Sequence, residues 1–263
     1  KMVKDELGEM PKREDIKVNP VSVNHFTWLT EARYKNIDLF PMYAKFCEKQ
    51  VPEKFWVRFA IPYVDCYSVW SPYLQQNKHI QPDWAPNVTY ANLASSMPVH
   101  SVIARNGNNR ITLAIDDAMT PTAIKTGVLE EDATIIVTLM FFTETTTAVD
   151  EYSATIRIDT RDIPFYDAVY DVVNWWESDC GYTPLNVPEH AKLPMNSLWY
   201  SYHQQLTPEC IIEEARLAKE LGMESVIVDD GWQTDDNGSG SAFCGDWELC
   251  TNKIHDMRAV DDK

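Results

Sequence analysis

The sequence is short of basic residues. Its 263 residues include 23 Lys and Arg against 40 Asp and Glu, a net charge of −17 at pH 7. An acidic surface repels nucleic acid and anionic membranes, so neither is expected as a partner. The charge favours a neutral or cationic ligand.

Long apolar runs are missing as well. The longest, Ile135 to Phe142, is interrupted by Thr138 and is far shorter than the ~20 residues that a bilayer-spanning helix needs. No signal-like apolar segment follows the opening Lys-Met-Val-Lys. We therefore expect a soluble chain without a membrane partner. The missing leader favours the cytoplasm, although a mature secreted or periplasmic chain would look the same.

Closely spaced cysteine pairs are also lacking. No two cysteines have the CxxC spacing, so neither a zinc site nor a dense disulfide framework is indicated. We expect reduced, structural thiols and no bound metal. The cysteines are Cys47, Cys66, Cys180, Cys210, Cys244 and Cys250.

The first 160 residues have the pattern of a β-sheet domain. Segments rich in Val, Ile, Thr and aromatic residues alternate with turn signals such as Asn106-Gly107-Asn108. They predict an antiparallel sandwich over residues 1–160. The acidic leader before about Asn19 is a surface arm or an extra strand pair. The predicted strands are Phe55 to Ile61, Tyr63 to Tyr73, Arg110 to Ile115, Ala133 to Phe142 and Tyr152 to Ile158.

Residues 161–196 are predicted to form a connector. A helix begins at Ile163-Pro164, with apolar residues at helical spacing. Trp175 and Trp176 on this helix are more typical of a core than of a sugar-stacking platform. The proline-rich segment from Cys180 to Met195 reads as an irregular linker. The apolar set of the helix is Phe165, Val169, Val172, Val173 and Trp176.

After the linker, residues 197–263 begin with a β-α-β pattern. Ser197 to Tyr202 is predicted to be a strand, and Thr207-Pro208-Glu209 is a helix start that runs to Gly222. Val226 to Val228 then predicts a parallel strand covered on both faces. The predicted buried face of the helix is Ile211, Ala215, Ala218 and Leu221, widened by Ile212 and Leu217.

Two adjacent carboxylates, Asp229 and Asp230, follow this second strand. In β-α-β units the ligand site lies at the carboxyl ends of the strands, and Gly231 permits the turn that would aim both side chains at one ligand. Carboxylates accept hydrogen bonds from sugar hydroxyls, and Trp232 offers an apolar face. Two alternatives remain: the pair caps a following turn, or it binds a divalent metal.

The segment LWYSYHQQLTPECIIEEARLAKELGMESVIVDDGWQ, followed by GDWE, resembles the start of the catalytic barrel in glycoside hydrolase family 36, the α-galactosidases and their relatives. The motifs in order are Trp199-Tyr200, the helix, Asp229-Asp230-Gly231-Trp232 and Gly245-Asp246-Trp247. The resemblance covers roughly Leu193 to Lys263 and is much weaker over the sandwich. Related family 27 enzymes usually have a cysteine in place of Gly231.

The resemblance implies an N-terminal β-supersandwich followed by the beginning of a (β/α)8 TIM barrel. It also implies a retaining mechanism with two aspartates. Asp229 and Asp230 match the residues that bind the galactose 4- and 6-hydroxyls. Trp199 and Tyr200 match aromatic residues of the sugar pocket, and Trp247 matches a loop tryptophan.

The nucleophile and the acid/base belong to later barrel strands, so the resemblance places both beyond residue 263. We therefore expect this chain to be an inactive fragment of an α-galactosidase-like hydrolase without a cofactor, acting on oligosaccharides or glycosides with a terminal α-galactose. Alternatives are a galactosyltransferase of the raffinose-synthase type, a hydrolase for a changed sugar such as N-acetylgalactosamine, and a non-catalytic carbohydrate-binding or structural sandwich. A homo-oligomer is expected from the resemblance alone.

Overall fold

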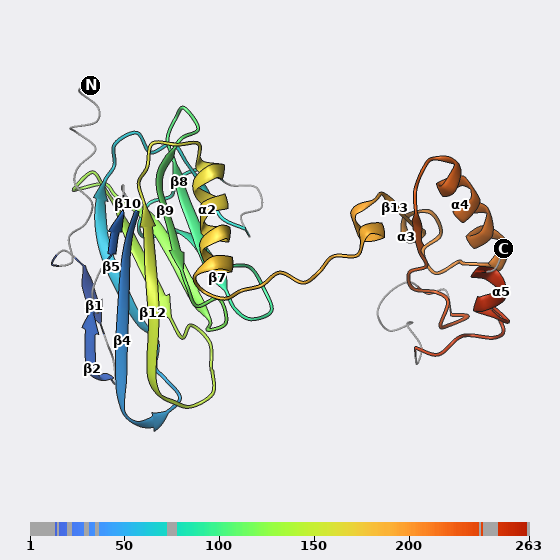
Figure 1. Ribbon diagram of the computed structural model, residues 1–263, viewed down its shortest axis with the longest axis horizontal. Helices are drawn as coiled ribbons and strands as arrows, with labels where there is room; N and C mark the ends of the chain where they lie inside the picture. The colour runs from blue at the N-terminus through green and yellow to red at the C-terminus, as the bar shows by residue number, and fades with distance from the viewer. Residues whose placement is uncertain are drawn as a thin grey trace. The chain divides into compact units, whose positions relative to one another are not determined.

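The chain forms two compact units, which divide between Thr183 and Pro184, inside the predicted connector. The computed structural model describes residues 14, 16–19, 23–28, 32–34, 37–72, 78–236, 238 and 247–261. Over these residues the first unit is two antiparallel sheets with a helix on one of them (Figure 1). The predicted β-rich fold with an N-terminal sandwich is confirmed. No described helix has the length and apolar character that crossing a bilayer requires.

The smaller sheet of the sandwich has five described strands, all paired antiparallel. Its centre is a hairpin whose two strands pair without interruption from Thr122↔Phe141 to Leu129↔Thr134. In spatial order the strands are β1 (Lys17–Asn19), β5 (Phe55–Pro62), β11 (Thr134–Phe141), β10 (Thr122–Leu129) and β7 (Asn87–Ala91).

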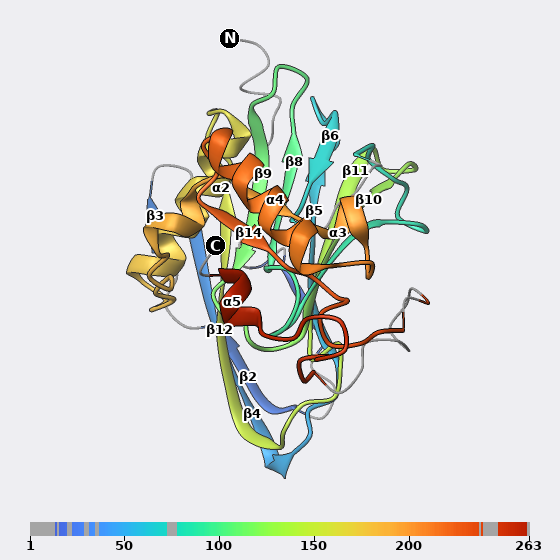
Figure 2. The same ribbon diagram turned by 90° about the vertical axis from the view of Figure 1, so that its right-hand side faces the viewer.

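The larger sheet has seven described strands, again antiparallel. Figure 2 shows its longest strands, β4 and β12, running side by side as a curved pair. In order the strands are β2 (Val23–Trp28), β4 (Ile37–Gln50), β12 (Val149–Asp159), β9 (Asn109–Ile115), β8 (Val99–Ile103) and β6 (Ser68–Trp70), with β3 (Ala32–Tyr34) also paired to β4.

The core of the sandwich lies between the two sheets. Along β5, Phe55, Val57 and Phe59 are buried while the residues between them are not, which is the alternation expected of a sheet with one covered face. They join Phe40 and Met42 of β4 in one apolar cluster. Each such side chain contributes roughly 1.5–3 kcal/mol when fully buried.

Four of the five predicted strands are present, as β5, β9, β11 and β12. The fifth, Tyr63 to Tyr73, is wrong for most of its described length, because only Ser68–Trp70 is a strand. The chain turns before it, with Asp65 at a φ of +50°. Tyr73 itself lies outside the described residues.

The predicted helix is confirmed as α2 (Phe165–Ser178), which follows Pro164. Its residues Val172 and Trp176 pack against β8 and β9, and the Trp176 ring nitrogen donates to the carbonyl of Ile115 at 2.9 Å. Trp176 is therefore a core residue, as predicted. Val173 was predicted on the buried face but is 37% exposed, because it points away from the covered stripe.

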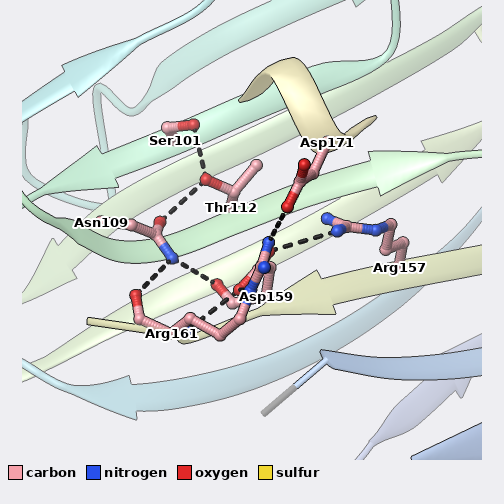
Figure 3. A network of polar contacts seen from close by, with 7 residues as sticks. All are labelled: Ser101, Asn109, Thr112, Arg157, Asp159, Arg161 and Asp171. Carbon is pink, nitrogen blue, oxygen red and sulfur yellow. Dashed lines mark hydrogen bonds and ion pairs between the residues drawn. The ribbon is translucent and has the colours of Figure 1, made fainter. Parts of the chain in front are cut away.

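A polar network anchors α2 to the larger sheet (Figure 3). Asp159 on β12 is fully buried and accepts hydrogen bonds from the guanidinium groups of Arg157 and Arg161. Arg161 also pairs with Asp171 of α2 at 2.6 Å. The Asn109 side chain donates to the carbonyls of Asp159 and Arg161, at 3.0 and 3.2 Å. The buried Asp159 carboxylate thus holds Arg161, and Arg161 links strand β12 to helix α2.

The second unit begins with an exposed proline-containing segment and continues into a β-α-β arrangement. The parallel strands pair from Met195↔Ser225 to Ser197↔Ile227. Of the implied barrel, the described residues contain this one unit. Its elements are the short 3₁₀ helix Glu189–Lys192, β13 (Met195–Ser197), α3 (Trp199–Tyr202), α4 (Pro208–Glu220), β14 (Ser225–Ile227) and α5 (Met257–Asp261).

The predicted strand Ser197 to Tyr202 is wrong beyond its first residue. The strand is Met195–Ser197, and the chain enters the helical turn α3 at Trp199. The carbonyl of Leu198 accepts the amides of Ser201 and Tyr202, at 3.2 and 3.0 Å. Leu198 itself is fully buried, so it points into the core while the backbone turns.

Helix α4 starts and stops as predicted. The Thr207 hydroxyl accepts the amide of Cys210 at 3.2 Å, and the Cys210 sulfur accepts the amide of Thr207 at 3.2 Å, which completes a capping box. Gly222 ends the helix with a φ of +81°. Ile211 and Ala218 are buried as predicted, but Leu221 is 77% exposed, because it lies at the C-cap beyond the packed stripe.

Candidate functional site

The predicted site residues lie after the carboxyl ends of two neighbouring strands. Because β13 and β14 are parallel, their carboxyl ends share one edge of the sheet. Trp199 and Tyr200 follow β13, whereas Asp229 and Asp230 follow β14. This is the edge where β-α-β proteins place their ligand sites.

Gly231 makes the turn after the aspartate pair. Its φ is +114°, a conformation that other residues rarely adopt, and an added Cβ would lie 2.6 Å from the Cα of Gln204. Gln204 belongs to the loop after α3 and is buried. The glycine therefore lets the loops that follow β13 and β14 touch, and the predicted turn is confirmed.

Both aspartates also make hydrogen bonds inside their own turn. Asp229 Oδ1 accepts the amide of Asp230 at 2.8 Å, and Asp230 Oδ1 accepts the Gln233 side-chain amide at 2.9 Å. Gln233 Oε1 in turn accepts the amide of Gly231 at 2.8 Å. A carboxylate has about four acceptor positions, so the exposed Asp229 combines this capping bond with capacity for a ligand.

The aromatic site residues differ in their surroundings. Trp199 is half-buried and meets the His203 ring edge-on, with centroids 5.0 Å apart. Tyr200 is 85% exposed and forms no covered wall within this unit. Trp247, 66% exposed, lies edge-to-face with Trp232 at 6.2 Å. That contact places Trp247 beside the Asp-Asp-Gly-Trp turn, while Gly245 and Asp246 of its motif lie outside the described residues.

The sequence pattern did not identify Lys253 as part of this region. Its ammonium donates to the carbonyls of Gln204 and Thr234, the latter at 3.3 Å, and so joins the two loops that Gly231 brings together. Burial lowers the pKa of Lys253. Its neighbours in the sequence, Asn252 and Ile254, give no signal that could have suggested this role.

Nothing in the described region suggests a metal centre, since no cluster of three or more His, Cys, Asp or Glu residues is found there. Carboxylates, an amide and exposed aromatic rings at one edge form a set of hydrogen-bond acceptors and apolar faces. Such a set suits recognition of a polyhydroxylated ligand.

No family model matches the chain. Short segments are similar to curated proteins named alpha-galacturonidase. The protein of Bacillus subtilis (strain 168) is 54% identical over 46 residues, which are 17% of this chain and 10% of that protein. The protein of Thermoanaerobacter italicus (strain DSM 9252 / Ab9) is 53% identical over 49 residues, 19% of this chain and 11% of that protein. The matches thus span about a tenth of the relatives' length and support a function related to glycoside hydrolases.

Proposed function

We propose that the complete protein is a glycoside hydrolase that cleaves terminal α-galactosides with retention of configuration. The observation that carries the proposal is the pair Asp229 and Asp230 in a glycine turn, at the edge where β13 and β14 both end. The short similarity to alpha-galacturonidases supports the broader class of glycosidase.

In this proposal the described residues hold the sugar rather than attack it. Asp229 and Asp230 accept hydrogen bonds from its hydroxyls, and the exposed ring of Trp247 covers its C–H face. Trp199 and Tyr200, which follow β13, are proposed to contact the sugar from the neighbouring loop. The nucleophile and the acid/base are carboxyl groups of a segment that the family resemblance places after residue 263, about 5–5.5 Å apart as retention requires.

The relatives' names make galacturonides the second candidate substrate. A galacturonide carries a carboxylate in place of the neutral 6-hydroxymethyl group of galactose. Bringing that charge beside Asp229 and Asp230 is unfavourable, because like charges repel. A neutral galactoside instead offers hydroxyl donors to both aspartates, so the charge of the site favours it.

The test is a comparison of kcat/KM on aryl α-galactoside, α-galacturonide and α-glucoside. It uses the chain extended by the segment that the resemblance places after residue 263. A site built to bind the axial 4-hydroxyl should prefer the galactoside to the glucoside by about four orders of magnitude. Faster cleavage of the galacturonide would make a galacturonide, in place of a galactoside, the proposed substrate. Equal rates on galactoside and glucoside would leave only the glycosidase assignment.

Three further assays separate the alternatives. Galactosyl transfer to an added sugar acceptor, faster than hydrolysis, would identify a transferase. A preference for the aryl N-acetylgalactosaminide would identify a changed sugar. Absence of turnover by the extended chain, with sugar binding retained, would identify a carbohydrate-binding protein.

Residues 1–263 alone should bind sugar without turning it over, because both catalytic carboxyl groups are proposed to lie later. Turnover by these residues that is abolished by changing one of their own aspartates would refute this.

A further inference from the structure

A cavity of about 370 Å³, widely open to solvent, lies in the sandwich unit, whereas the aspartate pair belongs to the second unit. It sits where β5 ends and the β10–β11 hairpin turns. Its volume is close to the lower end of the ~300–1,000 Å³ range of small-molecule sites. The residues around it are Tyr63, Ile80, Gln81, Pro82, Val128 and Glu130.

One wall of the cavity is formed by Ile80, Gln81 and Pro82, and the segment 79–87 that contains them is tied to β10. The amide of Val128 donates to the carbonyl of Gln81 at 2.9 Å, and the amide of Asp83 donates to the carbonyl of Val128 at 2.8 Å. Gly127 permits this approach, because an added Cβ would lie 2.6 Å from the Cα of Asp83. The wall therefore rests directly on the backbone of the strand.

A buried asparagine fixes the same segment from its other end. The Asn87 side chain accepts the amide of Gln81 at 3.0 Å and donates to the carbonyl of His79 at 3.1 Å. Opposite, the amide of Tyr63 donates to the carbonyl of Ala133 and holds the tyrosine beside the hairpin turn. Because backbone bonds fix both walls, the cavity is formed before any ligand arrives.

The side chains of the cavity combine the groups that sugars require. Tyr63 is 42% exposed, so part of its ring is available to stack on a sugar's C–H face. Glu130 supplies a carboxylate acceptor. Gln81 supplies an amide oxygen as acceptor and a second N–H as donor, since its nitrogen also donates to the carbonyl of His79 at 3.3 Å. Ile80 and Val128 give an apolar floor.

Charge selects among sugars. Glu130 lies in a turn with two further acidic residues, Glu131 and Asp132, in a chain of net charge −17. A uronate or a phosphorylated sugar would be repelled, whereas a neutral sugar offers hydroxyl donors. We propose that this cavity is a second saccharide site, which binds a neutral sugar residue of a galactoside and belongs to the sandwich unit, whereas Asp229 and Asp230 belong to the other unit. The choice of galactoside as ligand rests on the proposed function.

The site can be tested on the full 263-residue chain by following backbone amide NMR shifts during titration with raffinose. Raffinose is a neutral galactoside, and galacturonic acid serves as the charged comparison. Millimolar binding should shift the amides of Tyr63, Gln81, Glu130 and Ala133. Galacturonic acid should shift them at least tenfold less at equal concentration, an effect on the order of one charge repulsion.

Variants of the cavity should weaken this binding. Glu130→Gln removes a charged acceptor and should lower affinity about tenfold or more, and Tyr63→Ala should do the same through lost stacking. The matched controls Glu131→Gln and Tyr67→Ala change exposed neighbours outside the cavity and should bind like the parent chain. Dispersed amide spectra establish that each variant is folded.

The two proposed sites can be distinguished by the residues whose amide signals shift. With Asp230→Asn the shifts around Tyr63 should persist, even if binding at the aspartate pair disappears. Shifts confined to residues 199–233 would overturn the second site while supporting the proposed function. Shifts in the cavity that Glu130→Gln and Tyr63→Ala leave unchanged would also overturn it. Shifts in the cavity without any at Asp229 and Asp230 would support it and count against the proposed function.

Discussion

Acidification should destabilise the sandwich through one buried histidine, His100 on β8. It is completely buried between the sheets, where Thr89 on β7 and Thr126 on β10 contact its two ring nitrogens, each at 2.8 Å. One threonine donates to the unprotonated nitrogen and the other accepts from the N–H, so the neutral ring is fully satisfied. Burial lowers the pKa of His100 from 6.5 to about 4.

The direction of the effect follows from proton binding. Between pH 6.5 and about 4 the unfolded chain has His100 protonated while the folded chain keeps it neutral. Stability therefore falls as the pH drops through this window and is no longer affected by His100 below it. From about pH 7.5 to about pH 5 the loss attributable to this group is about 2 kcal/mol. In a unit of this size that corresponds to a fall in Tm of about 4–8 °C.

The assay is thermal unfolding of the full chain, followed by near-UV circular dichroism at both pH values. His100→Gln keeps one donor and one acceptor but cannot be protonated, so its loss between the two pH values should be about 2 kcal/mol smaller than that of the parent. The carboxyl groups contribute equally to the pH dependence of stability in the parent and in His100→Gln, so their contribution cancels in this comparison. His190→Gln, which changes an exposed histidine, is the control and should behave like the parent. Equal pH dependence in parent and His100→Gln would refute the reasoning.

Three further predictions concern the aspartate pair, its turn and the anchor of α2. With the extended chain and the proposed function, Asp230→Asn should lower kcat/KM by roughly tenfold to several hundredfold with little change in Tm, because a charged acceptor becomes a neutral one. Gly231→Ala should destabilise the second unit in urea unfolding by more than Gly222→Ala, since both have positive φ but only Gly231 meets another backbone. Asp159→Asn should cost about 3–5 kcal/mol in thermal unfolding, whereas Asp171→Asn, 41% exposed, should cost under about 1 kcal/mol.

Each of these has an outcome that contradicts it. If Asp230→Asn melts far below the parent while its folded fraction is fully active, the residue only caps the turn. Equal effects of the two glycine variants would show that the contact between the loops does not constrain the fold. Equal costs for the two carboxylates on α2 and β12 would show that burial does not determine the strength of the network.

Long alternating strands could be predicted from the sequence, but strands containing a breaker could not. Phe55 to Ile61 alternates cleanly and was recognised as β5. Strand β4 buries Phe40, Met42 and Phe46 at the same spacing, yet Pro41 stands among them and proline usually excludes a central strand. The strand forms because β12 and its neighbours cover it, which is information from distant parts of the chain.

The local geometry of the candidate site was predictable where neighbouring residues determine it. The Asp-Asp-Gly turn follows from a short β-branched strand that meets a glycine, and Thr207 determines the helix start. The prediction that both faces of this strand are covered is wrong for β14, because Ile227 is 43% exposed in this unit. The end of β13 could not be predicted, because Ser197 to Tyr202 has the composition of a strand although only Met195–Ser197 pairs with β14. The loop contacts of Lys253 depend on residues some fifty and twenty positions earlier, so no local pattern contains them.

The pairing of β4 with β12 has a consequence for synthesis on the ribosome. Ile37 pairs with Asp159, more than a hundred residues later, so one edge of β4 stays unpaired and its apolar face stays uncovered while the intervening strands are synthesised. At about 5–20 residues per second this interval lasts roughly 6–24 s. During that time Phe40, Met42 and Phe46 are available to any chaperone or sister chain nearby. Efficient production of this sandwich therefore depends on what shields one strand of the nascent chain.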